Sequence, residues 1–437
     1  MTRWPAEEEL PLLTDLYQLT MLQSYWRRGM NEPATFELFV RHLPLNRRFL
    51  VACGLEDAIA FLEALRFTDV AIDRLRSLQR FDDEFLRWLE TLRFTGDVWA
   101  IPEGEVFFAD EPMLRVTAPL PQAQFVETFL LNTMLYPCGV ASKAARVVIA
   151  AAGRDVVDFS TRRDHGVDAA LKAARAAWVS GCAGTSNVLA ATTLGIPAFG
   201  TMAHSYVMAF DREEDAFRAY VEEFPDRSVL LVDTYDTEEG LRRAATVGKE
   251  MAERGHRLLG VRLDSGDLIS LSRIARRILD EAGLRDTTIF VSGDLNEWRV
   301  EEIVASGAPV DGFGVGTELG VVADAPALPG VYKLVEYSGR SRAKRSTAKQ
   351  TLGGRKQVWR RDNGSDVLAL DEEWIEGAHP LLEPVMTKGR ATRRVMAEVS
   401  RARCASAVAG LPAELRDLAP CPADSGPRPE LSPALKG

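Results

Sequence analysis

GIPAFGTMAHSYVMAF, residues 195–210, is one of seven similar stretches that decide the fold of this chain. In each of them a short apolar run ends in small and polar residues, here Gly200, Thr201, His204 and Ser205, and a helical pattern follows. Short apolar runs that alternate with helices predict parallel strands joined by right-handed crossovers. The other six stretches are residues 156–166, 179–187, 228–237, 258–267, 288–297 and 310–319.

The number of these units bears on the kind of sheet they form. Seven strand ends with reactive side chains favour a TIM-like α/β barrel over an open sheet, because barrels gather functional residues at the carboxyl ends of their strands. A doubly wound open sheet is the alternative. Neither G-x-x-x-x-G-K-[ST] nor G-x-G-x-x-G occurs, so no motif supports a P-loop or a dinucleotide-binding fold.

The part of the chain before these units has the pattern of an α+β domain. Residues 54–93 show helical spacing of apolar residues. Residues 97–128 alternate apolar and polar residues between Pro and Gly breaks, which predicts a small sheet. One helix is expected from about residue 122 to Pro137 and a second from there to Ala150. No uninterrupted apolar run approaches the ~20 residues that cross a bilayer.

Composition argues against several classes of protein. The 437 residues carry 53 Lys and Arg against 63 Asp and Glu, and this net charge of −10 argues against general affinity for nucleic acid. Phosphates on a substrate must then be met locally, by Arg, by glycine amides or by a bound cation. The N-terminus lacks a basic segment and a long apolar core, so a cytoplasmic protein without a signal peptide is expected.

The cysteines also indicate a cytoplasmic protein. The five cysteines form no C-x-x-C pair, which indicates a reducing compartment and no zinc site. They are Cys53, Cys138, Cys182, Cys404 and Cys421.

Arginines and aspartates at the strand ends suit anionic substrates. Arg162 and Arg163 are fixed cations that can grip a carboxylate or phosphate in a bidentate way. Arg262 and Asp264 are two residues apart and therefore face the same side of a strand, with Asp267 following. Such a pair can combine anion binding with metal or hydroxyl binding. A buried ion pair of structural value is the alternative for this segment.

Small residues, acids and hydroxyls end other strands. The glycine-rich turn at residues 312–319 can present backbone N–H groups to a phosphate, as barrels do after their last strands. A simple tight turn gives the same pattern. The aspartates after the run at 228–232 can meet ribose hydroxyls or Mg²⁺. The residues concerned are Asp233, Thr234, Asp236, Ser292, Gly293, Asp294, Gly312, Gly314, Gly316 and Thr317.

His204 is one of five histidines and, with His165, one of two near such a strand end. A histidine in an apolar stretch is either a reactive group or a hydrogen-bonded core or capping residue. The basic stretch 333–361 is expected to be a solvated hairpin turning at Gly353–Gly354, with a nucleic-acid patch as the alternative.

Seven motifs, taken together and in order, resemble the nicotinate phosphoribosyltransferase family, over nearly the whole chain from Leu12 to about Arg394. They are TDLYQLTM (14–21), DFSTRRDHG (158–166), GTMAHS (200–205), VRLDSGD (261–267), SGDLNE (292–297), GFGVGTEL (312–319) and RSTAKQTLGGRKQVWR (345–360).

This resemblance implies a type II phosphoribosyltransferase, an irregular α/β barrel joined to an α+β open-faced sandwich. Residues 1–135 would begin the sandwich, residues 136–330 form the barrel with the active site, and residues 331–437 complete the sandwich, with a flexible tail from about 420. The implied reaction, part of NAD biosynthesis by salvage, makes nicotinate mononucleotide from nicotinate and 5-phosphoribosyl 1-pyrophosphate (PRPP). It implies Mg²⁺ and coupling to ATP hydrolysis.

The resemblance also implies roles for single residues. His204 would be phosphorylated, with Arg262 and Asp264 as catalytic partners, and Phe159 would sandwich the pyridine with Tyr17 of a partner subunit, which requires a homodimer. The other implied substrate contacts are Arg162, Ser186, Thr201, Ser292, Gly293, Asp294, Gly314, Gly316 and Thr317, and the implied magnesium ligands are Asp264 and Asp294.

One position bears on the choice of pyridine. Related nicotinamide phosphoribosyltransferases carry an Asp where this chain has Ser186, and a carboxylate there would repel nicotinate. We therefore expect nicotinate rather than nicotinamide to be the substrate, with nicotinamide phosphoribosyl transfer as the alternative. A non-catalytic RNA- or nucleotide-binding protein that uses residues 340–361 is a remote second alternative.

Overall fold

The computed structural model describes residues 6–344, 351–394 and 396–436. These residues form a mixed α/β structure with one parallel sheet and several antiparallel sheets. The chain divides into two compact units. One takes in the described parts of Met1–Ser142 and Ala325–Gly437, and the other is Lys143–Asp324, which we call the parallel-sheet unit.

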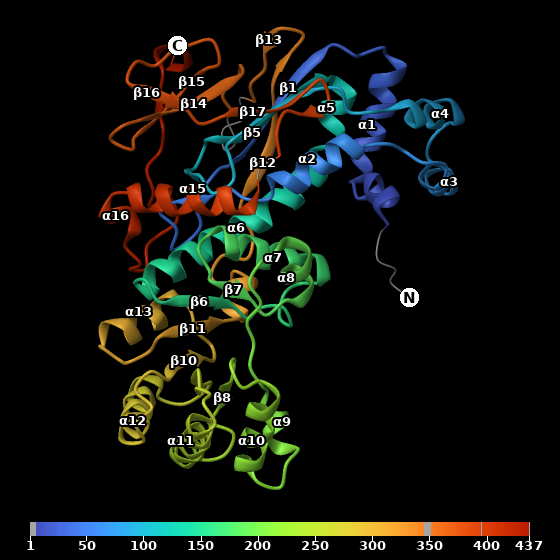
Figure 1. Ribbon diagram of the computed structural model, residues 1–437. Helices are drawn as coiled ribbons and strands as arrows, with labels where there is room; N and C mark the ends of the chain where they lie inside the picture. Colours follow the sequence, from blue (N-terminus) through green and yellow to red (C-terminus); the bar gives the residue numbers. More distant parts are fainter. Residues whose placement is uncertain (1–5, 345–350, 395, 437) are drawn as a thin grey trace. The chain divides into compact units, whose positions relative to one another are not determined.

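The parallel-sheet unit confirms the predicted parallel strands, shown in green to orange in Figure 1. In the described chain the sheet has the order β7-β6-β11-β10-β9-β8. Six of the seven predicted runs form a strand, whereas the run at 196–199 makes a single parallel bridge, from Ala198 to Thr185 of β7. The strands are β6 (Asp155–Asp158), β7 (Gly184–Thr185), β8 (Val229–Leu231), β9 (Gly260–Leu263), β10 (Thr288–Ser292) and β11 (Gly312–Val315).

Helices follow these strands, and polar side chains at the strand ends begin several of them. The side chains of Asn187, Asp236, Asp267 and Asn296 each accept a hydrogen bond from a backbone N–H in the first turn of the next helix. The helices are α7 (Val167–Val179), α8 (Val188–Leu194), α9 (His204–Met208), α10 (Glu213–Glu223), α11 (Thr237–Glu253), α12 (Leu268–Glu281), α13 (Glu297–Ala305) and α14 (Thr317–Gly320).

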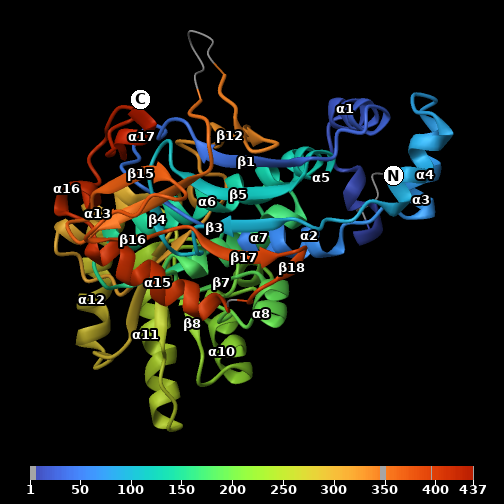
Figure 2. The ribbon, with the colours of Figure 1, turned by 90° about the horizontal axis from the view of Figure 1, so that it is seen from above.

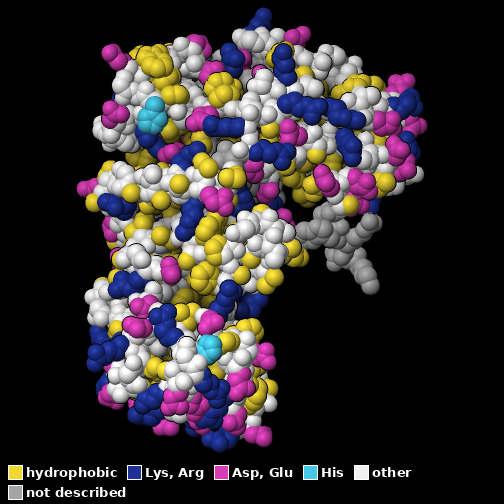
Figure 3. Space-filling view, viewed as in Figure 1, with side chains coloured by type: hydrophobic (Ala, Val, Ile, Leu, Met, Phe, Trp, Pro, Cys, Tyr) yellow, Lys and Arg dark blue, Asp and Glu magenta, His cyan; other side chains and the backbone are white. Residues whose placement is uncertain are grey.

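The outer faces of these helices carry charges of both signs. At the bottom of the view in Figure 3, over α10 to α12, Lys and Arg are interspersed with Asp and Glu. Arg218 of α10, for example, lies 2.6 Å from Glu214 and 2.8 Å from Glu250 of α11. Such a surface is solvated by paired charges and has little of the single-sign field that nucleic acid requires.

The other unit contains an antiparallel sheet built from both ends of the chain, in the order β13-β12-β1-β5-β3-β17-β18. Figure 2 shows its early strands β1, β5 and β3 beside the late strand β17. Phe36 of β1 pairs in register with Val116 of β5 and Leu334 of β12, and its ring stacks on Tyr332 at 4.9 Å. The strands are β1 (Pro33–Val40), β3 (Asp97–Ala100), β5 (Pro112–Pro119), β12 (Gly330–Tyr337), β13 (Arg340–Ser341), β17 (Glu383–Thr387) and β18 (Arg390–Ala391).

Smaller sheets and helices complete this unit. The sheet β16-β14-β15-β19 comprises β14 (Lys356–Arg361), β15 (Asp366–Leu370), β16 (Ala378–Pro380) and β19 (Glu430–Leu431), and β2 (Leu50–Val51) pairs with β4 (Val106–Phe107). The helices are η1 (Glu7–Leu12), α1 (Leu16–Arg27), α2 (Leu55–Ala64), α3 (Asp69–Ser77), α4 (Asp83–Thr91), α5 (Leu120–Phe125), α15 (Ala397–Gly410), α16 (Ala413–Arg416) and α17 (Pro433–Lys436).

The prediction of a helix break at Pro137 is wrong. Helix α6 runs without interruption over Glu127–Ala151, with Pro137 inside it. Pro137 leaves the carbonyl oxygen of Thr133 without its helical donor, and this oxygen lies against Gly54, where a Cβ would be 2.5 Å away. Within the described residues α6 is the one helix long and apolar enough to span a membrane, but 78% of its apolar window is buried, as in the core helix of a globular protein.

The basic stretch is arranged differently from the prediction. Residues 345–350, the start of its last motif, lie outside the described residues. β12 turns into β13 at Ser338–Gly339, and Gly354 donates its N–H to Val335 of β12 at 2.8 Å, so no hairpin turns at Gly353–Gly354. Beyond residue 420, β19 pairs with β15. The predicted flexibility of this tail stays a prediction.

Candidate active site

Arg262 lies at the centre of a polar cluster at the carboxyl ends of the parallel strands. Its guanidinium donates from Nε to Ser292 Oγ at 2.8 Å, from one terminal nitrogen to Thr201 Oγ1 at 3.3 Å and from the other to Asp264 Oδ1 at 2.7 Å. The guanidinium carbon lies 5.2 Å from the centre of the Phe159 ring, within range of a cation–π contact. Four separate strand-end segments therefore meet at one half-buried cation.

His204 opens helix α9 and faces the same cluster. Its Nδ1 lies 3.1 Å from Thr234 Oγ1, and its Nε2 lies 3.8 Å from Asp264 Oδ2. The imidazole is 40% exposed. Nδ1 is thus within hydrogen-bond distance of Thr234, whereas the separation between Nε2 and Asp264 is longer than a hydrogen bond. The ring is also open to solvent, which suits a group that reacts with a ligand.

Asp233 is joined to the Asp264 segment by hydrogen bonds. Asp233 accepts hydrogen bonds at Oδ2 from the backbone N–H of Asp264, at 2.8 Å, and from the Ser265 hydroxyl, at 2.7 Å. Its other oxygen, Oδ1, is buried without a hydrogen-bond partner within the described chain. Because buried carboxylate oxygens are normally satisfied, this oxygen is available to a ligand.

Asp264 is ionised by its surroundings. Burial raises the pKa of its carboxyl, but the Ser292 hydroxyl, which donates to it at 2.5 Å, and the positive charge of Arg262 outweigh burial. His204 adds to them in the same direction, so the pKa is lowered overall. A negative charge therefore lies between the arginine and the histidine at neutral pH.

The last residue of β6 and the segment after it hold a second pair of carboxyls, Asp158 and Asp164. Asp158 is buried and accepts from the Ser160 hydroxyl at 2.6 Å and from Thr185 at 2.7 Å. Burial raises the pKa of the Asp164 carboxyl to about 6, and the nearby charge of Asp158 adds to the effect. Ser160 Oγ also lies 3.0 Å from Asp164 Oδ2. Since a hydroxyl has one hydrogen and Asp158 receives it, a protonated Asp164 completes this network.

Two phenylalanines line a cavity of about 230 Å³ beside the cluster. The rings of Phe159 and Phe290 lie with their centres 5.8 Å apart. They occupy the space above two glycines of β11, because a Cβ on Gly314 would come within 2.6 Å of the Phe159 ring and one on Gly312 within 2.9 Å of Phe290. Thr201 also lines this cavity, which extends from the Arg262 cluster to Asp155, Thr288 and Asp311 near the amino ends of the strands.

The turn after β10 is tightly folded. Gly293 has φ +96° and the next residue, Asp294, has φ +46°. A Cβ on Gly293 would lie 2.0 Å from the Asp264 carbonyl oxygen, so only glycine allows this approach of the two strand ends. Asp294 itself is exposed.

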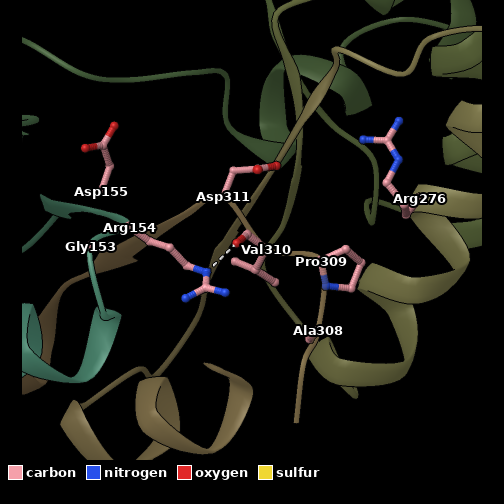
Figure 4. Close-up of a pocket in the computed structure, with 8 residues that line it drawn as sticks. All are labelled: Gly153, Arg154, Asp155, Arg276, Ala308, Pro309, Val310 and Asp311. Atoms are coloured by element: carbon pink, nitrogen blue, oxygen red, sulfur yellow. Dashed lines mark hydrogen bonds between the residues drawn. The ribbon is translucent and has the colours of Figure 1, made fainter. Parts of the chain in front are cut away.

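A larger cavity of about 440 Å³ lies near the amino ends of β6 and β11, away from the cluster. Figure 4 shows Arg154 donating to the Val310 carbonyl oxygen, at 2.9 Å. The second arginine of this cavity, Arg276, donates to Asp280 and to the carbonyl oxygens of Leu284 and Thr287. Both guanidinium groups are hydrogen-bonded within the protein, and this cavity is lined by none of the residues that contact Arg262.

Comparison with known proteins places the chain in a family. The family model described as the nicotinate phosphoribosyltransferase (NAPRTase) N-terminal domain matches residues 12–135, and the one described as the NAPRTase family matches residues 155–354. The chain belongs to the nicotinate phosphoribosyltransferase family. It is 50% identical over 413 residues to a nicotinate phosphoribosyltransferase of Mycobacterium tuberculosis, covering 93% of this chain and 89% of that one.

The chain is also similar to two further members of this family. A nicotinate phosphoribosyltransferase of Bacillus subtilis is 43% identical over 383 residues, which cover 84% of this chain and 78% of the relative. The crystal structure of the human nicotinic acid phosphoribosyltransferase superposes with a TM-score of 0.85 at 30% identity, covering 97% of this chain and 98% of that chain.

Within this family member, the structure gathers part of the predicted set. Arg262, Asp264, Thr201, Ser292 and His204 share contacts, and Phe159 lies under the arginine. Of the other candidates, Arg162, Thr317 and Tyr17 are exposed, and Ser186 and Gly316 are half-buried.

Some of the predicted site residues have structural roles that the sequence did not reveal. Asp236 caps α11 by accepting from the Glu239 N–H at 2.9 Å, and Asp267 caps α12. Gly314 makes room for aromatic rings, a reason for glycine that involves no phosphate. Phe290 was missed. It lies two residues before Ser292 on the same strand, so its position on the inner face was the available signal.

Proposed function

We propose that this chain is a nicotinate phosphoribosyltransferase that joins the ring nitrogen of nicotinate to C1 of the ribose of PRPP and releases pyrophosphate. Family membership supports this reaction. The observation that carries it is the guanidinium of Arg262, which lies over the Phe159 ring and contacts Thr201 beside an apolar cavity. A flat ring with one carboxylate fits such a site.

The pyridine is held by its ring and by its carboxylate. Phe159 would cover one face of the ring, with Tyr17 of a partner subunit on the other, since Tyr17 is 48% exposed here. Arg262 and Thr201 would receive the carboxylate. A hydroxyl at Ser186 suits the acid better than a carboxylate would, and we propose that it contributes to selecting nicotinate over nicotinamide.

The departing pyrophosphate needs charge stabilisation more than covalent help. Backbone N–H groups after Ser292 and Val315, with Thr317 and Arg162, would hold the phosphates of PRPP. When bound, Mg²⁺ would neutralise part of the diphosphate charge. Asp264 and Asp294 are our candidates for contact with it, and the unpartnered Oδ1 of Asp233 fits the same role.

These carboxylates do not form a closed metal cage. Within the described ranges no group of three or more His, Cys, Asp or Glu side chains is arranged to hold a metal ion. One or two carboxylates together with substrate phosphates are the usual surroundings of Mg²⁺ in such reactions. We therefore propose that the cation arrives with the diphosphate.

ATP coupling would pass through His204. Its Nδ1 faces Thr234, which leaves Nε2 as the nitrogen that would attack the γ-phosphorus of ATP and form a phosphohistidine, with ADP as the leaving group. The phosphoryl group adds negative charge beside Asp264 and can reorganise the loops that hold the substrates. Hydrolysis of the phosphohistidine after transfer completes the cycle.

Two features of the architecture belong to the same proposal. The first parallel strand, β6, lies between β7 and the last strand, β11, and Ala198 makes a parallel bridge to Thr185 of β7. The place of the first strand inside the order, with helices following the strands, supports our proposal of an irregular α/β barrel. The sheet made of early and late strands supports an open-faced sandwich domain. We further propose a cytoplasmic homodimer, with domain boundaries near residues 136 and 330.

One assay tests the function. Purified protein is incubated with PRPP, Mg²⁺ and either nicotinate or nicotinamide, with and without ATP, and the mononucleotide and pyrophosphate are measured. We expect nicotinate mononucleotide, formed faster with ATP. Product from nicotinamide alone would move the assignment to nicotinamide phosphoribosyl transfer, and no product with salt-sensitive RNA binding would favour the binding protein.

A further inference from the structure

A largely buried ion cluster joins the two chain ends of the parallel-sheet unit. Lys143 is the first residue of this unit and Asp324 the last. The Lys143 Nζ lies 2.6 Å from Glu297 Oε2 and 2.9 Å from Asp324 Oδ1. The side chains of Lys143 and Glu297 are both 0% exposed. One ammonium thus contacts two carboxylates far apart in the sequence.

A second cation and an aromatic ring complete this cluster. Arg146, one turn further along α6, donates from Nε to Glu297 Oε1 at 3.0 Å. The ring centre of Trp298 lies 5.0 Å from Lys143 Nζ and 5.9 Å from the Arg146 guanidinium carbon. Taking such charges out of water costs several kcal/mol per ion, and apolar replacements are often as stable. Stability alone is therefore a weak reason for this cluster.

The two carboxylates adjoin two loops of the site. Glu297 is the first residue of α13, directly after the tight turn that contains Gly293 and Asp294. The side chain of Asn296 caps the same helix by accepting from the Arg299 N–H at 3.0 Å. Movement of Glu297 would therefore be passed to the turn after β10 through a short and hydrogen-bonded connection.

Asp324 is coupled to the other loop in a similar way. Thr317 and Gly320 bound the short helix α14, which follows β11. The N–H of Ala323 donates to the Glu318 carbonyl oxygen at 3.2 Å and that of Val322 to Leu319 at 3.2 Å. These bonds make residues 317–324 one folded turn that ends at the Lys143 ammonium.

We propose that Lys143 is a positioning residue for PRPP, because it fixes the turn after β10 relative to the turn after β11 through Glu297 and Asp324. The inference rests on the proposed function, in which these two turns hold the phosphates. Lys143 touches no substrate. It sets the distance between two groups of backbone N–H donors, and a misplacement of about 1 Å between such groups can cost on the order of 100-fold in rate.

Asp324→Asn is the first test, because it keeps the shape of the side chain and leaves the Glu297–Arg146 pair in place. We expect its KM for PRPP to rise by about tenfold or more, while its KM for nicotinate stays within about twofold. Lys143→Met should show the same pattern with a larger effect. Steady-state kinetics with each substrate varied in turn measure this difference.

Asp371→Asn is the matched control. Asp371 lies 2.6 Å from the buried Arg115, whose guanidinium carbon lies 5.2 Å from the Trp99 ring centre, in the other unit. This variant removes the same kind of ion pair beside the same kind of ring. We expect it to lower the melting temperature without a selective change in the KM for PRPP.

Hydrogen exchange separates failure of this inference from failure of the proposed function. Asp324→Asn should speed backbone exchange in residues 293–298 and 317–323 and leave β1 and β5 unchanged, whatever the substrate is. Equal changes in both KM values, or exchange no faster in these two turns than in wild type, would overturn the positioning role. A wild-type protein that makes no mononucleotide would instead overturn the proposed function.

Discussion

In the proposed function His204 is the residue that couples ATP to transfer; its imidazole is half-exposed, with Thr234 at 3.1 Å and the ionised Asp264 at 3.8 Å. We expect His204→Ala to reduce ATP hydrolysis by on the order of 1,000-fold or more, as removal of a nucleophile does, while slow nucleotide formation persists. Separate assays of ADP and of nicotinate mononucleotide measure the two activities.

The control is His256→Ala. His256 is also 40% exposed and pairs with Asp226 at 3.2 Å, outside the cluster. It should leave both activities unchanged. ATP hydrolysis that stays coupled to transfer in His204→Ala would contradict the phosphohistidine role.

Asp164 makes stability depend on pH. Because burial raises the pKa of its carboxyl in the folded protein from 3.8 to about 6, its protonated form stabilises the fold at low pH. This contribution is complete below about pH 4 and is lost as the pH rises through about 6. The folded protein therefore loses this stabilisation between about pH 4 and pH 6.

Asp164→Asn tests this dependence, since an amide can donate to Ser160 Oγ at every pH. We expect the melting temperature of wild type, relative to that of the variant, to fall as the pH is raised from 4.5 to 7. Thermal unfolding in buffers across this range measures the difference. Parallel curves for the two proteins would show that Asp164 is ionised throughout.

At the scale of elements, strand β11 shapes the site because two of its residues are glycines, which have no side chain. Gly312 and Gly314 leave room for the rings of Phe290 and Phe159, so the inner face of this strand shapes the cavity floor. Gly314→Ala places a methyl group 2.6 Å from the Phe159 ring. Overpacking of this kind costs about 1–3 kcal/mol, and the displaced ring should raise the KM for nicotinate several-fold.

Gly410→Ala is the matched control for this strand variant. Gly410 ends α15, and a Cβ there would meet no atom within 4 Å. Its melting temperature and KM should match wild type or improve slightly. If Gly314→Ala binds nicotinate as wild type does, Phe159 does not form the wall of the pyridine site.

The seven strand-end stretches also show what periodicity can predict at this scale. Apolar runs followed by helical patterns were enough to place six parallel strands, because a buried parallel strand and an amphipathic helix have different sequence periods. The run at 196–199 has the same composition but makes one bridge only. The predicted helix break at Pro137 was wrong for a different reason, because α6 is buried enough to continue as a helix across a proline.

At the scale of the whole molecule, the chain leaves one unit at Ser142 and returns to it at Ala325. The proposed pyridine site takes Arg262 from one subunit and Tyr17 from its partner. Tyr17→Ala and Arg262→Lys homodimers should therefore each be nearly inactive. After mixing, unfolding and refolding, half of the dimers are mixed and carry one intact site, so about a quarter of wild-type activity should return.

Gel filtration and the nucleotide assay measure this complementation together. Refolding each variant alone is the control for recovery by refolding itself. Dimers that regain no activity on mixing, although mixed dimers form, would mean that Tyr17 and Arg262 act within one subunit or that Tyr17 is a packing residue.

The sequence by itself determined the α/β class, the strand ends that carry polar residues and the family, because these follow from local periodicity and from motifs that are read along the chain. It named Arg262, Asp264, Thr201, Ser292 and His204 without showing that they meet. Only the tertiary structure decided that Asp236 and Asp267 are caps, that Gly314 makes room for rings, and that Lys143 lies buried between Glu297 and Asp324. These contacts join segments that are far apart in the sequence. They depend on how the strands pair and how the turns between them fold, and a local sequence pattern contains no information about the distance between such segments.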